Sequence, residues 1–202
     1  VDNVAIIFAG LNEAESGNSV AVWPHKGDIA DRNIFCNGVK IASYTCSSEY
    51  SGDALENWPA TIGSFCHEFS HTLGLPDFYD TNYDEDGTWA SGLWKHTSLM
   101  DGGNYNNLGN TPPNYNAIER MIAGISEPVT LAKSGMYSLQ GIGSSNRFYK
   151  IEDADPDIFY LLECRVEKDW DAHIGGSGML AYRIDLSRGK RICAPHFMYY
   201  YR

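Results

Sequence analysis

The sequence predicts an α+β fold in which a twisted sheet and two helices precede a β-rich segment, and three observations lead to it. Short apolar runs rich in β-branched residues lie near the start of the chain. Apolar residues then recur at three- and four-residue spacing in two segments between residues 60 and 124. After Pro128 this spacing gives way to short strand-like runs separated by turns. We therefore expect two parts, residues 1–126 with a sheet and helices, and residues 127–202 built from strands.

Two runs predict the first strands. "VAIIFAG" is short, apolar and ended by Gly10, which is typical of a buried strand. "GVKIASYTCSSEY" alternates apolar and polar residues, which indicates one or two further strands. The start of the chain lacks the basic stretch of a signal peptide, so we expect a mature or trimmed piece that opens on a core strand.

Two helices are predicted in the middle of the chain. The first covers about Ala60 to Leu73 and follows Pro59, a residue that suits the start of a helix. Its apolar stripe consists of Ile62, Phe65, Phe69 and Leu73. The second begins near Asn114 in "PPNYNAIERMIAGI" and stops by Gly124. The long segment between them, from about residue 80 to 111, lacks periodicity but is rich in aromatic residues, so we expect it to be ordered and functional.

The second part of the chain contains four predicted strand segments. They are "VTLAKSGMYSLQGI", "NRFYKIED", "DIFYLLECRVE" and "GMLAYRIDL". Each is short and is bounded by turn residues, which favours an all-β arrangement.

Charge and hydropathy exclude several classes of partner. The net charge of -11 argues against nucleic acid or an anionic membrane as the main partner, because a basic surface is missing. No apolar run is long enough to span a membrane. The sequence leaves the oligomeric state open.

The five cysteines are Cys36, Cys46, Cys66, Cys164 and Cys193. None forms a CxxC pair, which argues against a cysteine-based zinc or redox site. In an exported protein, Cys36 and Cys46 are the pair that would close a short loop as a disulfide. The odd number leaves at least one thiol free.

The segment "HEFSH" predicts a catalytic zinc site. His67 and His71 are four residues apart, and a helix places both imidazoles on one face, close enough to hold one ion. Zinc binds imidazole nitrogen readily, and a catalytic zinc keeps one position open for water. Glu68 is offset from that face, so its carboxylate can take a proton from the water without binding the metal. The alternative, two structural histidines, is disfavoured because H-E-x-x-H arises by chance in very roughly one chain in a hundred or two.

The residues that follow extend this motif to H-E-x-x-H-x-x-G-x-x-D. Gly74 can adopt a left-handed conformation that ends the helix and turns the chain sharply. Asp77 then stands where a related motif has its third histidine, and a carboxylate oxygen is an accepted zinc ligand. Asp80 is the alternative third ligand, but the spacing favours Asp77.

Two further features follow the motif. The segment "SLMDGG" predicts that Met100 forms a methionine turn that supports the histidines without binding metal, although a lone methionine is usually core filler. The segment "DFYDTNYDEDG" is rich in oxygen ligands that suit calcium, with Asp80, Asp84 and Asp86 as its candidate residues. The alternative for this segment is a solvated acidic loop.

The segments "HEFSHTLGLPDFYD", "SLMDGGNY" and "PPNYNAIER" together resemble the immune inhibitor A family of secreted bacterial metallopeptidases, within the metzincins. The segment "YLLECRVEKDWDAHIGGSGMLAYRID" is similar to the β-rich region that follows the catalytic domain in that family. The resemblance implies an exported, often calcium-stabilised zinc endopeptidase that acts on extracellular proteins. It also implies that His67, His71 and Asp77 bind zinc and that Glu68 is the general base.

Some features depart from that family. Metzincin catalytic domains usually have a longer sheet ahead of the zinc helix, so residues 1–126 are expected to lack a first strand and helix, and residues 127–202 to be an incomplete accessory domain. We expect the substrate-binding edge strand in "IASYTCSSEY", where substrate would add as a further strand. Tyr105 is the nearest candidate for the tyrosine that assists the reaction in some metzincins, but its offset from Met100 does not match.

The main hypothesis is therefore a zinc-dependent endopeptidase. The first alternative is a metal-stabilised binding or adhesion module derived from a protease and lacking catalysis. The second is a zinc hydrolase that acts on non-peptide bonds. The presence of every motif residue argues against a decayed catalytic site.

Overall fold

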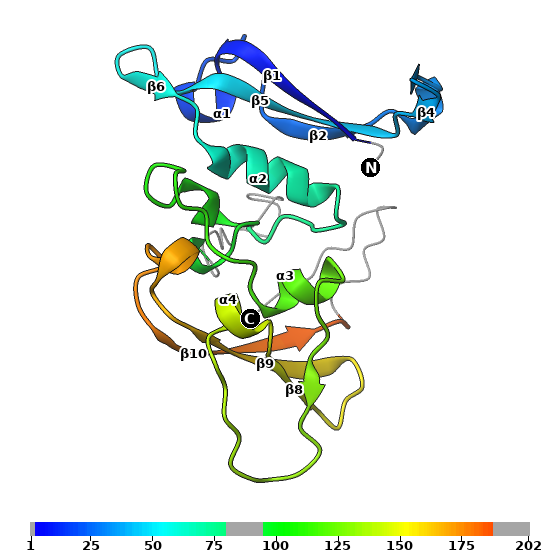
Figure 1. Cartoon of the computed structure of the whole chain (residues 1–202), viewed down its shortest axis with the longest axis vertical. Helices are drawn as coiled ribbons and strands as arrows, with labels where there is room; N and C mark the ends of the chain where they lie inside the picture. Colours follow the sequence, from blue (N-terminus) through cyan, green and yellow to red (C-terminus); the bar gives the residue numbers. More distant parts are fainter. Residues whose placement is uncertain (1–2, 80–94, 188–202) are drawn as a thin grey trace.

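The computed structural model describes residues 3–79 and 95–187 and shows a mixed α/β fold with several sheets and few helices (Figure 1). One sheet lies at the top of this view, a second lies at the bottom, and the helices α2 (Ile62–His71) and α3 (Ala117–Ile122) lie between them. Within the described ranges, no helix is long and apolar enough to cross a membrane.

The first sheet contains β1 (Asn3–Leu11), β5 (Ser43–Gly52), β2 (His25–Asp28) and β6 (Asn57–Pro59). Strand β5 pairs with β1 in parallel, and with β2 and β6 in antiparallel orientation. The short helix α1 (Glu13–Ser16) follows β1, and a small hairpin of β3 (Phe35–Cys36) and β4 (Val39–Lys40) follows β2.

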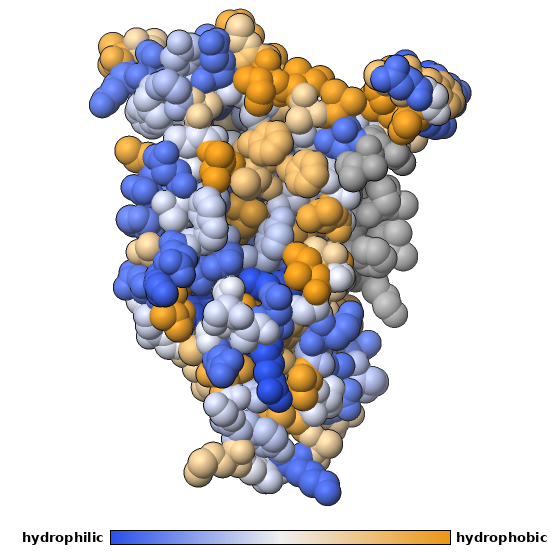
Figure 2. All heavy atoms as spheres, viewed as in Figure 1, coloured by the Kyte–Doolittle hydropathy of each residue, from blue (hydrophilic) through white to orange (hydrophobic). Residues whose placement is uncertain are grey.

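The prediction that the first strand is buried is wrong. Strand β1 pairs only with β5 among the described strands, so it forms an edge of the sheet. Its apolar side chains Val4, Ile6 and Ile7 are exposed, and Ile7 retains 61% of its accessible surface. Figure 2 shows hydrophobic side chains gathered along this sheet at the top of the molecule. The apolar run correctly predicted a strand, but whether a strand is buried depends on the elements that pack over it.

The prediction that "IASYTCSSEY" supplies the edge strand is also wrong. Strand β5, which contains most of this segment, pairs with β1 on one side and with β2 and β6 on the other. Both rows of its backbone groups are therefore used within the sheet. Strand β2 pairs only with β5 in the part of the chain that the structure describes, and it packs against α2.

Both predicted helices are present. Helix α3 begins with a capping box in which the Asn116 side chain accepts from the Glu119 backbone N–H and the Glu119 side chain accepts from the Asn116 backbone N–H. Helix α2 buries its polar face, with Gly63, His67, Glu68 and Ser70 as its buried residues. The apolar stripe of the predicted helix is partly exposed, with Ile62 at 45% and Leu73 at 42%. The helix therefore buries His67 and Glu68 of the H-E-x-x-H motif.

The second sheet has the strand order β10 (Gly178–Asp185), β9 (Ile158–Arg165), β8 (Tyr149–Glu152) and β7 (Val129–Thr130). Strand β9 is antiparallel to both β8 and β10, whereas β7 runs parallel to β8. The short helix α4 (Ile142–Ser145) precedes β8. Alternate residues of β9 are buried, which places the charged Glu163 and Arg165 inside the protein beside Leu161.

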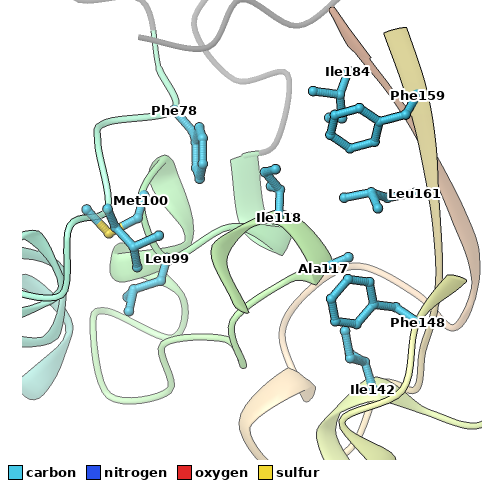
Figure 3. Close-up of a cluster of buried hydrophobic side chains, with 11 residues drawn as sticks. Phe78, Leu99, Met100, Ala117, Ile118, Ile142, Phe148, Phe159, Leu161 and Ile184 are labelled. Carbon is cyan, nitrogen blue, oxygen red and sulfur yellow. The ribbon is translucent and has the colours of Figure 1, made fainter. Parts of the chain in front are cut away.

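One hydrophobic cluster joins the two predicted parts of the chain (Figure 3). Phe78, Leu99, Met100, Ala117 and Ile118 enter it from one side of residue 126. From the other side it receives Ile142, Phe148, Phe159, Leu161 and Ile184. The division at residue 126 stays a prediction, and the two parts share this core.

The cysteines Cys36, Cys46, Cys66 and Cys164 are all free thiols, so the loop closure considered for Cys36 and Cys46 is not formed. Cys36 is exposed and Cys46 is buried. Burial raises the pKa of Cys46, which favours the neutral thiol over the reactive thiolate.

Candidate metal centre

The side chains of His67, His71 and Asp77 converge at the C-terminal end of α2. The two imidazole rings lie 5.0 Å apart between centroids and are perpendicular to each other. Oδ1 of Asp77 lies 3.1 Å from Nε2 of His67 and 3.5 Å from Nε2 of His71. Two residues from one helical face and one residue beyond the helix thus direct their donor atoms to a single point.

Backbone carbonyls orient both histidines. Nδ1 of His67 lies 2.9 Å from the carbonyl oxygen of Leu99, and Nδ1 of His71 lies 2.7 Å from that of Leu75. A carbonyl oxygen only accepts, so each Nδ1 carries the hydrogen. In the neutral imidazole this leaves the lone pair on Nε2, which is the tautomer that binds a metal ion.

The turn after α2 brings Asp77 to this point. Gly74 has a φ of 88°, in the left-handed region that glycine adopts without strain. Its N–H donates to the carbonyl of His71, and the N–H of Leu75 donates to that of Ser70, which is the hydrogen-bond pattern of a Schellman motif. The same turn therefore reverses the chain towards Asp77 and aims the Leu75 carbonyl at His71.

The donor set fits a zinc ion. Neutral His67 and His71 present acceptor nitrogens to an acceptor oxygen of Asp77, so the three atoms repel one another unless a cation lies among them. Two donors on one tetrahedral zinc, each bonded at about 2.0 Å, are about 3.3 Å apart. The two distances to Asp77 bracket that separation. The fit concerns both the kind of atom and the spacing.

Glu68 lies beside this point but further from it. Its Oε2 is 4.0 Å from Nε2 of His71, and ligand atoms of Glu68 and both histidines lie within 4.8 Å of one another. The side chain is nearly buried, and burial raises its pKa, although the neighbouring histidines oppose this shift. A carboxylate with a raised pKa next to a metal site is suited to accept and return a proton.

Charge links the histidines to Asp77 in the metal-free protein. Burial lowers the pKa of His67, but the hydrogen bond and charge of Asp77 outweigh it, so the net pKa is raised above 6.5. Burial also favours the neutral form of Asp77, yet hydrogen bonds from both histidines hold its pKa well below the usual range. In the metal-free protein, a protonated His67 and an ionised Asp77 therefore stabilise each other.

Met100 lies in a turn directly under the helix, and its side chain is completely buried. The preceding residue, Leu99, supplies the carbonyl that binds His67. The backbone carbonyl of Met100 accepts from the N–H of Phe78 at 2.8 Å, which ties the turn to the segment that carries Asp77. The turn thus supports both sides of the cluster.

Tyr105 lies at the end of a short 3-10 segment, Gly102–Tyr105, and is 50% exposed. Partial burial raises its pKa, and the charges of Glu15 and Glu68 raise it further. Its catalytic role stays a prediction.

Some predicted residues lie outside the described ranges. These are Asp80, the alternative third ligand, and the remaining calcium candidates Asp84 and Asp86. Conversely, sequence reasoning missed the carbonyls of Leu75 and Leu99, because a backbone acceptor leaves no mark in a side-chain motif.

Comparison with known proteins shows the family of this chain. A family model described as "Immune inhibitor A peptidase M6, catalytic domain" matches residues 1–121, a range that includes α2, Asp77 and Met100. The curated protein "Immune inhibitor A" of Bacillus thuringiensis subsp. alesti is 28% identical over 122 residues, which are 57% of this chain and 17% of that protein. The "Pre-pro-metalloprotease PrtV" of Vibrio cholerae serotype O1 (strain M66-2) is 28% identical over 123 residues, 56% of this chain and 12% of that protein.

The matched region is thus a small fraction of either relative. The family model, by contrast, covers more than half of this chain, including the helix with both histidines and the turn that follows it. The chain therefore belongs to the immune inhibitor A family, the M6 metallopeptidases.

Proposed function

We propose that this chain carries the catalytic site of a zinc-dependent endopeptidase with a metzincin-like arrangement. The observation that carries the proposal is the convergence of His67 Nε2, His71 Nε2 and Asp77 Oδ1, with the Glu68 carboxylate beside them. The first three residues are proposed as ligands and Glu68 as the general base. Tyr105 stays a candidate helper that would donate a hydrogen bond to the substrate.

The residues divide the chemistry between them. Zinc bound by the three ligands would supply Lewis acidity, which polarises a peptide carbonyl and favours deprotonation of a water. Glu68 takes the proton of the attacking water and returns it to the amine that leaves when the C–N bond breaks. Its partly desolvated carboxylate suits both steps, because burial brings its pKa closer to neutrality.

The free edge of β2 is the proposed place for the substrate backbone. Strand β2 packs against α2, and His25 on this strand is close enough to Glu68 for its charge to lower the pKa of that carboxylate. An extended peptide that adds to this edge would present an internal bond to the site, because strand addition requires no chain end. This geometry favours an endopeptidase.

The setting of the enzyme follows from its relatives. One of them is named a pre-pro-metalloprotease, which describes a precursor with leader and pro-segments. We extend this to the present chain and propose a protein exported by a bacterium, with extracellular proteins as substrates. Residues 1–126 would form the catalytic part and residues 127–202 a β-rich accessory part. Calcium binding by the acidic segment that contains Asp80, Asp84 and Asp86 remains proposed.

Replacing Glu68 tests the mechanism. In the variant Glu68→Ala, cleavage of casein is expected to fall by about 100-fold or more, because the proton acceptor is lost. Zinc content should stay at the wild-type value, because the three ligands are intact. The matched control is Glu56→Ala, since Glu56 is an exposed glutamate just before β6 and lies outside the candidate site.

Three results would contradict the proposal. Cleavage by Glu68→Ala at the wild-type rate would rule out Glu68 as the base. Wild-type protein that binds zinc but cleaves no peptide in a broad library would favour the binding-module alternative. Wild-type protein that binds no zinc would remove the metal site itself.

A further inference from the structure

A buried glutamate of α3 accepts hydrogen bonds from the turn of residues 97–100, which lies beneath the histidines. Glu119 is completely buried. Its Oε1 accepts from the hydroxyl of Ser98 at 2.6 Å and from the backbone N–H of Met100 at 3.0 Å. Its Oε2 accepts from the backbone N–H of Asn116 at 2.7 Å. A single carboxylate therefore binds two points of the turn and the start of its own helix.

Leu99 lies between the two points of the turn that Glu119 holds. Its carbonyl oxygen accepts from Nδ1 of His67 at 2.9 Å. Figure 3 shows Leu99 and Met100 close together in the core, facing the helix that carries Ala117 and Ile118. Fixing Ser98 and Met100 fixes the peptide plane between Leu99 and Met100, and with it the direction in which this carbonyl points.

The other end of the turn is held from the β-rich part of the chain. The guanidinium of Arg165, on β9, donates from Nη1 to the carbonyl of Thr97 at 2.9 Å. Asp171 fixes the same guanidinium, accepting from its Nε at 3.0 Å. The turn from Thr97 to Met100 is therefore hydrogen-bonded at one end to Arg165 and at the other end to Glu119. Both residues lie outside the H-E-x-x-H motif.

We propose that Glu119 is a positioning residue for the metal centre, acting through Met100 and the Leu99 carbonyl to hold the imidazole of His67. The inference rests on the proposed function in one respect, that the cluster of His67, His71 and Asp77 binds zinc. Groups that orient a metal-binding histidine typically change metal affinity by about 10- to 100-fold when they are removed.

The carboxylate cannot be replaced by its closest isostere. The backbone N–H of Met100 points at one oxygen and that of Asn116 at the other. Glutamine has one acceptor oxygen and one NH₂ donor, so either orientation of its amide sets a donor against a donor. In Glu119→Gln, the amide therefore loses either the turn or the helix start.

The test compares Glu119→Gln with Glu163→Gln. Glu163 is equally buried, and neither of its carboxylate oxygens contacts the turn: Oε1 accepts from the Tyr182 hydroxyl and from Nη1 of Arg165 at 3.3 Å, and Oε2 accepts from the Ala117 N–H. A glutamine oxygen at the position of Oε1 keeps the contact with Arg165. Zinc affinity is measured by competition with a chelator, at a temperature where both variants are folded. Glu119→Asp, whose shorter side chain no longer reaches the turn, is expected to bind zinc about tenfold or more weakly. Glu119→Gln is expected to do so where its NH₂ faces the Met100 N–H, while Glu163→Gln loses thermal stability but keeps wild-type affinity.

Two further measurements keep the test decisive if Glu119→Gln does not fold. Glu119→Asp keeps the charge at the start of α3 but shortens the reach to the turn, so it too should bind zinc more weakly. In NMR spectra of metal-free protein, the exchange-protected Nδ1 proton of His67 should be lost or shifted in the Glu119 variants and kept in Glu163→Gln.

The outcomes separate this inference from the proposed function. Wild-type zinc affinity together with an unchanged His67 signal in both Glu119 variants would overturn the positioning role. Equal losses of zinc affinity in Glu119→Gln and Glu163→Gln would also overturn it, since the effect would then be general destabilisation. If wild-type protein binds zinc without cleaving peptides, the proposed function fails, and the affinity comparison still decides the role of Glu119.

Discussion

At the scale of single residues, the pKa values of His67 and Asp77 depend on each other. His67 is buried, which by itself favours the neutral imidazole, yet Asp77 raises its pKa above 6.5. Asp77 in turn has a depressed pKa because both histidines donate hydrogen bonds to it. A metal ion bound by these residues, as proposed, would therefore compete with a proton for the same place.

This competition predicts how the stability of metal-free protein varies with pH. The raised pKa of His67 gives stabilisation that is fully present below 6.5 and is lost as pH rises through the folded-state pKa. The depressed pKa of Asp77 gives stabilisation that is present above 3.8 and is lost as pH falls through its folded-state value. The melting temperature in chelator should therefore fall as pH rises from about 6.5 to about 8, while the gain on adding zinc grows.

The measurement is thermal unfolding across that pH range, with chelator and with zinc. The control is Asp77→Asn, which removes the charge that raises the His67 pKa and should flatten the dependence. A melting temperature in chelator that rises over the same range would contradict the coupling.

At the scale of elements, α2 is an amphipathic helix whose polar face is buried. The space beneath that face holds the turn of Met100 and the loop that follows it, and the N–H of Gly63 donates to the carbonyl of Gly109 at 2.9 Å. A Cβ on Gly63 would lie 1.8 Å from the backbone oxygen of Asn104, far inside contact distance. The approach of helix and loop thus depends on this glycine.

Gly63→Ala is accordingly expected to lower the free energy of unfolding by about 3 kcal/mol or more, because two backbone segments must separate. It should also weaken zinc binding, since α2 carries both histidines. Denaturant unfolding measures the first effect. The matched control is Gly178→Ala, where no atom lies within 4 Å of the new Cβ, and wild-type-like stability of Gly63→Ala would show that the loop adjusts freely.

At the scale of the whole molecule, the metal centre and the β-rich sheet share one core. The cluster that holds Met100 and Phe78 also holds Leu161 and Phe159 of β9, and β9 supplies the Arg165 contact to Thr97. The predicted boundary at residue 126 therefore divides the sequence at a point where the packing is continuous. We expect both parts to unfold together.

Leu161→Ala tests this cooperativity. Leu161 is fully buried, so its truncation should cost about 2–5 kcal/mol and lower the midpoint of a single transition. Loss of bound zinc and loss of β-sheet signal should coincide in that transition. Met179→Ala serves as control because Met179 is 65% exposed, and two separate transitions would show that the parts fold independently.

Comparison of prediction and structure shows which features the sequence alone could give. The spacing of His67 and His71 placed them on one helical face, and Gly74 gave the left-handed turn, because both follow from local backbone geometry. The capping box of α3 is equally local. Short runs bounded by turns predicted β8, β9 and β10, while the first predicted segment forms only the two-residue strand β7. The burial of Glu163 and Arg165 was not predicted, since charged residues are seldom buried.

By itself, the sequence determined the kinds of groups at the candidate metal centre and their order along the helix and turn. Only the tertiary structure decided which oxygen atoms orient the histidines, that β5 lies inside the sheet with partners on both sides, and that α2 turns its polar face inward. Those features depend on contacts between segments distant in sequence, such as Glu119 with Met100 and Arg165 with Thr97. Local propensity carries no information about such contacts, because they form only when the two parts of the chain pack together.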